Sequence, residues 1–258
     1  MILDDICEKR KEQLEREKQR LSLADVKAMC RECSHTPVSF ARALKQDRLS
    51  VICEVKKASP SKGLISPDFR PVETAVCYEK SGAAAVSCLT EEHYFQGSSE
   101  YLKAIREKIA IPILRKDFII DEYSIYEARA IGADAVLLIA AILDRAQMQE
   151  YMALAHELGL QTLTEVHNEK EIEKVGDLPT DCLGINNRDL TNFEVSLETT
   201  ARLAELTKCE VLVSESGIKT NEDMRTVSAY GADAVLIGET LMRSGNIADT
   251  LMLLRNGV

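Results

Sequence analysis

The sequence predicts a single (β/α)8 barrel, an α/β fold, from a repeated motif, the chain length and the make-up of the strand segments. The motif Gly-Ala-Ala/Asp-Ala-Val begins at Gly82, Gly132 and Gly231. In each copy the glycine follows a helix-like segment and precedes an apolar strand, the usual place of a left-handed helix cap. The glycines lie 50 and 99 residues apart, which fits two and four strand-helix units of about 25 residues. A chain of 258 residues has room for eight such units.

Eight strand segments can be placed at this spacing. They are nearly continuous runs of Val, Ile, Leu and Ala, which is typical of a parallel sheet covered by helices. Helical periodicity separates them, for example over 148–158. The strands are expected near 51–56, 84–89, 111–116, 134–140, 160–165, 182–186, 210–214 and 233–238. No Pro/Gly/Ser-rich linker interrupts the pattern, so residues 1–258 are expected to form one domain.

About fifty residues precede the first expected strand. This segment, 1–50, is expected to add helices to the barrel. It carries opposite charges at helical spacing, such as Asp5 with Lys9 and Glu12 with Arg16, and such pairs usually form a solvated helix face. Most of the segment is therefore interpreted as a solvent-exposed helical extension.

Composition and charge exclude several classes of protein. A net charge of −10 argues against a nucleic-acid partner, because neutralising phosphates needs a surplus of Lys and Arg. The longest apolar run, 135–143, is nine residues long, whereas a membrane span needs roughly 20. The charged start has no secretory apolar core, so the chain is expected in the cytoplasm without a membrane partner. Cys30 and Cys33 lack two further ligands for zinc, and no metal is expected.

Charged residues close several of the expected strands, where the catalytic groups of a barrel lie. Side chains alternate along a strand, so Glu54 and Lys56 share the face that points into the barrel mouth. They form either a functional pair or an ordinary buried ion pair. Lys116 ends the third strand, although the alternation does not decide whether it faces inward. There it could be a general acid if neighbouring positive charge and desolvation lower its pKa.

Three more strand ends carry polar groups. Glu165 is a candidate base or charge stabiliser, and Glu215 ends the seventh strand. Asn186 and Arg188 offer an amide and a guanidinium suited to a carboxylate or phosphate. Any one of them could merely cap a helix or lie on a loop surface. Their recurrence at so many strand ends favours a common site.

Three loops of small residues favour a phosphate site. They contain Ser59, the pair Ser216-Gly217, and Gly238-Glu239 before a short helix. Exposed N–H groups at a helix start bind anions, and barrels commonly hold phosphate after strands seven and eight. Neither a Walker A motif nor a dinucleotide-binding Gly-rich motif occurs, which argues against a nucleotide cofactor. Phe95, on the loop after the second strand, either stacks on a ligand or packs on its own loop.

Five segments resemble the indole-3-glycerol-phosphate synthase family, in the same order and at barrel spacing from about residue 2 to the end. They are 54–63 (EVKKASPSKG), 89–95 (LTEEHYF), 113–118 (ILRKDF), 184–190 (GINNRDL) and 214–218 (SESGI). The resemblance implies cofactor-free conversion of 1-(2-carboxyphenylamino)-1-deoxyribulose 5-phosphate into indole-3-glycerol phosphate, carbon dioxide and water in tryptophan biosynthesis. It also implies a small phosphorylated substrate as the partner.

The resemblance also implies a role for each matching residue. Lys116 would be the main general acid at the ribulose carbonyl, Glu165 the base or stabiliser, and Glu54 with Lys56 the proton-transfer and dehydration pair. Asn186 and Arg188 would orient the anthranilate end of the substrate. The implied substrate contacts are Ser59, Phe95, Glu215, Ser216, Gly217, Gly238 and Glu239, with Lys56 also at the phosphate. Glu239 stands where many relatives have a small hydroxyl, so only its backbone N–H is expected to contact the phosphate.

Three alternatives remain open. A Schiff-base aldolase on the same barrel would use Lys116 or Lys56 as a covalent amine. Another phosphoribosyl isomerase would not need the pair of Glu54 and Lys56. A catalytically silent barrel would bind an anion or a partner helix. Association with other tryptophan-pathway enzymes is a further expectation of the resemblance.

Overall fold

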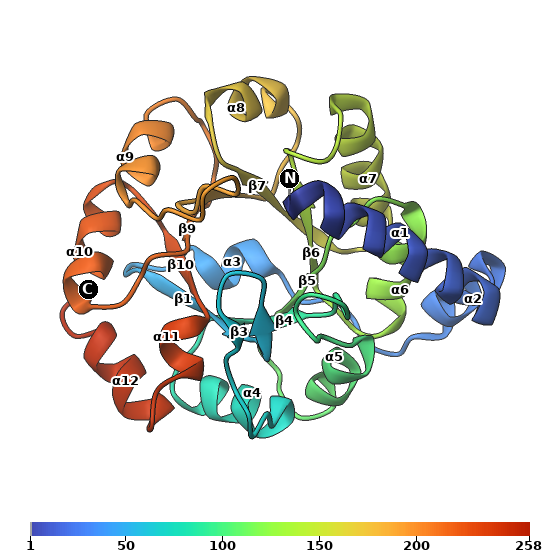
Figure 1. Cartoon of the computed structure of the whole chain (residues 1–258), viewed down its shortest axis with the longest axis horizontal. Coiled ribbons are helices and arrows are strands. Elements are labelled where there is room, and N and C mark those ends of the chain that lie inside the picture. Colours follow the sequence, from blue (N-terminus) through green and yellow to red (C-terminus); the bar gives the residue numbers. More distant parts are fainter. Residues whose placement is uncertain (1) are drawn as a thin grey trace.

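Eight parallel strands close into a barrel in the computed structural model, which describes residues 2–258 (Figure 1). The barrel closes where β1 pairs with β10, with Ser50 opposite Ala234. The strands are β1 (Ser50–Val55), β4 (Ala85–Leu89), β5 (Ile113–Lys116), β6 (Ala135–Ile139), β7 (Gln161–Val166), β8 (Cys182–Asn186), β9 (Leu212–Glu215) and β10 (Ala234–Ile237). The predicted barrel and the position of each strand are confirmed.

Helices surround the strands in an outer ring (Figure 1). They are α4 (Pro71–Lys80), α5 (Ser99–Arg106), α6 (Glu122–Ala130), α7 (Arg145–Glu157), α8 (Glu169–Val175), α9 (Glu198–Ala204), α10 (Asn221–Ala229), α11 (Glu239–Met242) and α12 (Ile247–Leu254). Capping boxes begin α7 at Asp144 and α10 at Thr220. Gly82, Gly132 and Gly231 have φ of 82°, 87° and 91°, so the repeated motif marks left-handed turns from helix to strand, as expected.

The strands divide the core into two apolar layers. On β1, Val51, Cys53 and Val55 pack outward among the helices, whereas Ile52 packs inside the barrel with residues such as Leu114 from the other strands. Because side chains alternate, the residues that share the face of Ile52 point into the barrel. This alternation places Glu54 on the inner face, as the sequence predicted.

The N-terminal segment covers both ends of the barrel. It forms α1 (Ile2–Arg20), α2 (Leu23–Glu32) and α3 (Phe40–Leu44). Phe40 and Leu44 of α3 are fully buried and belong to the apolar layer inside the barrel. In Figure 1, α1 lies in front of the barrel and α3 behind its strands. The segment is helical, as predicted.

Two details of the extension differ from the prediction. Lys9 pairs with Glu12 at 2.8 Å, three residues away, rather than with Asp5. Arg10 is fully buried instead of solvated. A buried arginine on α1 contacts the barrel directly, so the interpretation of this helix as mainly a solvated addition is wrong at that position.

The loop after β1 contains a small hairpin that periodicity did not reveal. Its strands, β2 (Ala58–Ser59) and β3 (Gly63–Leu64), have two residues each and pair in antiparallel register. Strands this short carry no alternating pattern that could be recognised in the sequence. Within residues 2–258, no helix combines the length and the apolar character needed to span a bilayer.

Candidate active site

All thirteen predicted site residues line one cavity of about 530 Å³ at the carboxyl ends of the strands. They come from seven of the eight barrel strands or the loops that follow them. This clustering is the geometry that the predicted barrel requires. The cavity is lined at one side by Ile2, Leu3 and Ile6 of α1, which were not predicted to take part.

Lys116 lies at the centre of the charged residues. Its Nζ donates a hydrogen bond to Glu165 Oε2 at 2.9 Å and lies 3.2 Å from Glu215 Oε2. The orientation that the sequence left open is inward: Leu114 belongs to the inner apolar layer, and Lys116 is two residues further along the same strand. Three side chains from three strands therefore meet inside the barrel.

The surroundings of Lys116 are negative, whereas a lowered pKa would have required neighbouring positive charge. Burial disfavours the ammonium, but Glu165, Glu215 and Glu54 outweigh that effect and hold the pKa of Lys116 above its ordinary value. The condition under which the sequence allowed a lowered pKa is therefore not met. Lys116 is held as an ammonium, the protonated form from which a general acid acts.

The two carboxylates beside Lys116 have opposite pKa shifts. Burial disfavours the charged form of Glu165, yet the cations Lys116 and His167 outweigh it and hold its pKa well below the usual range. Burial raises the pKa of Glu215 to about 7, with a smaller opposing effect from Lys116 and repulsion from Glu165. Two carboxyl groups whose environments separate their pKa values are suited to different acid-base tasks.

Glu54 and Lys56 form a close ion pair within the cavity. The Glu54 side chain is 5% exposed and that of Lys56 17%, so the pair is largely shielded from water. Gly238 makes room for it, because a Cβ at this position would run into the Glu54 carboxylate and the Lys56 ammonium. Gly184 likewise leaves space for the Glu215 carboxylate. Both glycines serve close approach rather than a turn.

A second part of the cavity is suited to an anion. Ser216 and Gly217 have φ of 68° and 92°, and a left-handed backbone at a non-glycine residue marks a strained loop of the kind found at binding sites. Lys62, Lys219 and Arg243 line the same region; of these, Lys219 and Arg243 were not singled out from the sequence. Their side chains supply positive charge beside the small-residue loops.

Glu239 places a carboxylate on the anion-binding side of the cavity. Its Oε1 lies 3.1 Å from Arg243 Nε and 3.9 Å from Lys62 Nζ. The pairing with Arg243 offsets its negative charge, so the carboxylate does not need to face a bound anion. The expectation that only its backbone N–H contacts phosphate stays a prediction.

The opposite side of the cavity is apolar. Phe95 lies 6.1 Å from Phe118 between ring centroids, and Leu137 and Ile139 line the cavity nearby. The buried Glu91 carboxylate orders the loop of Phe95 by accepting hydrogen bonds from three successive backbone N–H groups, 93 to 95, at 2.8 to 2.9 Å. A flat ring could lie against this wall.

His167 is a site residue that sequence reasoning missed. Its Nε2 lies 3.2 Å from Glu165 Oε1, and its Nδ1 lies 3.0 Å from Glu171 Oε2. Burial disfavours the imidazolium, but the close contacts with the charged carboxylates of Glu165 and Glu171 outweigh it and raise the pKa of His167 to about 10. The sequence contained a signal for His167, because it lies two residues after Glu165 and side chains two apart along a strand point to the same face. The histidines had been judged only for metal-ligand spacing.

No group of three or more His, Cys, Asp or Glu side chains between residues 2 and 258 is arranged to hold a metal ion. The chemistry available from the described residues is proton transfer by carboxylates, an ammonium and an imidazole next to an anion-binding region. Barrel and site together define an acid-base enzyme of the (β/α)8 class with a small anionic substrate.

Comparison with known proteins identifies the family. The model of the family described as indole-3-glycerol phosphate synthase matches residues 3–254. The chain belongs to this family, as its sequence motifs had implied. The protein of that name from Neisseria meningitidis serogroup C is 49% identical over 251 residues, covering 95% of this chain and 96% of its own. The one from Alkaliphilus metalliredigens is 44% identical over 259 residues, covering 100% and 99%.

Solved structures with much lower identity share the fold. A 3-hexulose-6-phosphate synthase from Salmonella typhimurium has a TM-score of 0.66 at 14% identity and covers 81% of this chain and 97% of its own. A thiamine phosphate pyrophosphorylase from Pyrococcus furiosus has a TM-score of 0.62 at 19% identity and covers 84% and 96%. These likenesses concern the barrel alone.

Proposed function

We propose that the cavity carries out the indole-3-glycerol phosphate synthase reaction, with Lys116 as the general acid and Glu165 as its partner base. The observation that carries this assignment is the 2.9 Å hydrogen bond between these two side chains, which come from different strands and are both largely buried. An acid and a base held together in a dry pocket can move protons without a metal or a redox cofactor.

The reaction needs protons at two points. Ring closure joins an anthranilate carbon to the ribulose carbonyl carbon, and the carbonyl oxygen takes up a proton as the new bond forms. The Lys116 ammonium delivers that proton. Carbon dioxide then leaves from the ring carbon, and its bonding electrons restore the aromatic ring.

Dehydration completes the indole. The hydroxyl formed from the carbonyl leaves as water after receiving a second proton, and a carboxylate removes one proton from the neighbouring carbon. We assign the acid-base work of this step to the ion pair of Glu54 and Lys56 together with Glu165. Lys116 contacts Glu165, and its pKa is also raised by the charge of Glu54, so the two pairs are electrostatically linked.

The substrate would span the cavity from the cationic side to the apolar side. Its phosphate would meet the backbone N–H groups of Gly217 and Gly238, the Ser59 hydroxyl and the Lys56 ammonium. Its anthranilate ring would lie against Phe95, and its carboxylate would be oriented by Asn186 and Arg188. The remaining three assigned contacts are Glu215, Ser216 and the backbone N–H of Glu239. Among the described residues, nothing donates a hydrogen bond to the buried Glu215 Oε1, which leaves it open to a substrate donor.

The Schiff-base alternative is less compatible with the electrostatics. A covalent amine must lose its proton before it attacks a carbonyl, and catalytic lysines of this kind have lowered pKa values. The pKa of Lys116 is shifted in the opposite direction by three carboxylates. This argument favours proton delivery over covalent catalysis by Lys116.

Incubation with the carboxyphenylamino-deoxyribulose phosphate tests the function directly. We expect indole fluorescence to appear with one carbon dioxide per product and without added metal or cofactor. Borohydride added during turnover should leave the protein unlabelled, whereas an aldolase would be trapped with its substrate. Labelling at Lys116 or Lys56, or the absence of indole, would contradict the proposal. The cytoplasmic location and an association with other enzymes of the pathway stay predictions.

A further inference from the structure

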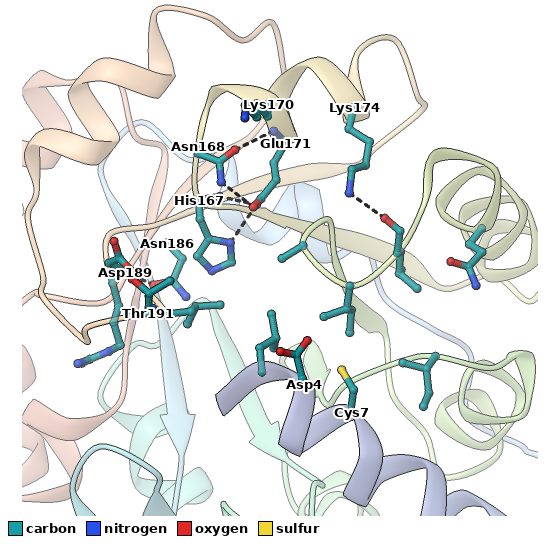
Figure 2. A pocket seen from close by; sticks show the side chains of 18 of the residues that line it. Asp4, Cys7, His167, Asn168, Lys170, Glu171, Lys174, Asn186, Asp189 and Thr191 are labelled. Carbon is teal, nitrogen blue, oxygen red and sulfur yellow. Dashed lines mark hydrogen bonds and ion pairs between the residues drawn. The ribbon is translucent and has the colours of Figure 1, made fainter. Parts of the chain in front are cut away.

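A second cavity adjoins the active-site cavity, and both are lined by Leu3, Asn186, Arg188 and Leu190. Its volume is about 1280 Å³, and it is bounded by α1 on one side and by the loops after β6, β7 and β8 on the other. Figure 2 shows His167, Asn168 and Glu171 on one wall, facing Asp4 and Cys7 of α1 across the open space. We call this cavity the rear groove. Its polar walls give water a place close to the barrel interior.

His167 lies between the rear groove and the active-site cavity. The imidazole lines the groove, while its Nε2 is 3.2 Å from Glu165 Oε1, an atom of the active-site cluster. The other oxygen of the same carboxylate accepts the hydrogen bond from Lys116 at 2.9 Å. The side chains thus form a continuous row from the groove to the proposed general acid: His167, Glu165, Lys116.

The ring of His167 is held in place by the start of α8. Glu171 Oε2 accepts a hydrogen bond from the His167 backbone N–H at 2.8 Å and lies 3.0 Å from Nδ1 of the ring. Asn168 Nδ2 donates to the other Glu171 oxygen at 2.7 Å. Figure 2 draws these contacts as a small network above the groove. The ring is therefore fixed through Nδ1, which leaves Nε2 directed at Glu165.

The contact with Glu165 is less constrained. Nε2 is buried and makes no aligned hydrogen bond with any described residue, so the 3.2 Å approach is an ion pair rather than a directed bond. Buried polar atoms normally have a partner. A nitrogen held at contact distance without an aligned bond can exchange partners with a small rotation of the ring.

The reaction requires a source of protons. The substrate enters with an ionised carboxylate, which leaves as neutral carbon dioxide. Two protons are delivered, one to the carbonyl oxygen and one to the departing hydroxyl, and one is removed from carbon. Each turnover therefore consumes one proton from solvent. Bound substrate occupies the cavity in front of Lys116, so resupply from that side has to wait until product has left.

We propose that His167 is the proton relay that reloads Lys116 from water in the rear groove through Glu165. The inference rests on the proposed roles of Lys116 and Glu165. In the reloading step Nε2 releases its proton to the Oε1 atom of the ionised Glu165 carboxylate. The carboxyl group then turns so that its protonated oxygen faces Lys116, and gives that proton to the neutral amine, which restores the ammonium and the carboxylate. The imidazole then takes a proton from water or a buffer acid in the groove. His167 does not contact substrate, so it acts as a positioning and relay residue.

The direction of transfer agrees with the proton affinities. The pKa of Lys116 lies above its ordinary value of 10.5, and that of His167 is raised to about 10. A neutral Lys116 therefore takes a proton from the imidazolium favourably. Glu165 from β7 and Glu171 from α8 contact the imidazole, and Asp4 of α1 faces it across the groove (Figure 2). Asp189, in the loop after β8, has a pKa lowered by hydrogen bonds with Thr191 and, to a smaller extent, by the charge of His167. Glu165 and Glu171 keep the ring cationic between turnovers.

Replacement of His167 should slow later turnovers but not the first one. In His167→Ala, the first turnover uses protons already loaded on the enzyme, so its rate with enzyme in excess should stay within about twofold of the wild type. Steady-state kcat should fall about 10²-fold, the scale of a lost proton-transfer group, with KM little changed. Mixing with excess substrate should therefore give a burst of one indole per site followed by slow turnover.

A small buffer acid should replace the lost ring. Imidazole fits the groove and should raise the steady-state rate of His167→Ala in proportion to its concentration, without affecting the burst. His167→Gln preserves a polar side chain beside Glu165 but cannot carry a proton, so it should show the same burst; this variant also serves if the alanine variant folds poorly. His156→Gln is the matched control, because His156 pairs with Asp181 at 2.8 Å and lines neither cavity. It should behave as the wild type.

The possible outcomes distinguish the proposed His167 relay from the roles of Lys116 and Glu165 on which it rests. An equal loss in the first turnover and in the steady state would show that His167 supports the chemistry or the structure of the site, and the relay would be refuted. An unchanged steady state, or a burst that imidazole does not relieve, would refute it as well. The proposed roles of Lys116 and Glu165 would be refuted by a different result: variants of these two residues that keep the wild-type rate in the first turnover.

Discussion

The Nε atom of Arg10 on α1 lies 3.2 Å from the Oδ1 atom of Asp117, and both side chains are completely buried. Asp117 directly follows Lys116 in the chain. Arg115 contacts the other Asp117 oxygen at 3.1 Å. The N-terminal helix is thus tied by an ion pair to the strand end that carries the proposed general acid. The same helix contributes part of the wall of the active-site cavity.

Arg10→Met should destabilise the protein by about 3 kcal/mol, because removing one partner leaves a buried carboxylate with less compensation. Chemical denaturation would measure the change in the free energy of unfolding. The matched control is Arg16→Met on the exposed side of the same helix, which should stay within about 0.5 kcal/mol of the wild type. Equal effects of the two substitutions would mean that the buried pair does not anchor α1.

Lys116→Ala should abolish turnover while the fold is retained. Removal of a general acid typically costs about 10² to 10⁴-fold in rate, and Glu165 also loses the ammonium that it accepts a hydrogen bond from. Indole fluorescence would measure activity, and circular dichroism would check the fold. Wild-type activity in a folded variant would defeat the assignment of Lys116.

Glu165→Gln should lower kcat far more than it raises KM. The amide keeps the size of the carboxylate but neither holds the charge opposite Lys116 nor accepts a proton, and an interaction made mainly in the transition state appears in kcat. Steady-state kinetics over a range of substrate concentrations would separate the two constants. A loss confined to KM would assign Glu165 to binding instead.

Gly238→Ala should lower kcat/KM by about 10²-fold, the scale expected when catalytic groups are displaced by about an ångström. The added methyl group would run into the carboxylate of Glu54 and the ammonium of Lys56. Gly245→Ala is the matched control, since a Cβ there meets open space, and it should leave the kinetics unchanged. Normal activity in Gly238→Ala would mean that the close approach is not required.

Glu215→Gln should become more stable relative to the wild type as pH rises from 5 to 8. The pKa of Glu215 is raised to about 7 in the folded protein, against about 4.3 in the unfolded chain. The folded state therefore holds a proton that the unfolded state has lost, and the wild type loses stability between these values. The amide does not titrate, so the difference should grow by about 3 kcal/mol.

Unfolding of both proteins at pH 5 and pH 8 would measure this difference. The comparison cancels the opposite contribution of Glu165, whose lowered pKa stabilises the fold at higher pH. A difference that is constant with pH would show that Glu215 is not protonated near neutrality in the folded state.

Much of the barrel was predictable because its signals are local. The turn glycines of the repeated motif and the apolar strand runs are short-range features, and they placed each strand to within a few residues. The inward orientation of Glu54 and Lys56 followed from alternation with the valines of the same strand. At the third strand both faces were apolar, so the orientation of Lys116 could not be read in this way.

The sequence by itself determined the fold, the family and thirteen of the residues that line the cavity, because periodicity and motif order are properties of neighbouring residues. Only the tertiary structure decided the electrostatic state of the site. It surrounded Lys116 with carboxylates from three other strands, connected His167 to Glu165 and buried Arg10 against Asp117. A pKa depends on charges that lie close in space and on their distance from water, and both follow from the closure of the barrel rather than from chain order.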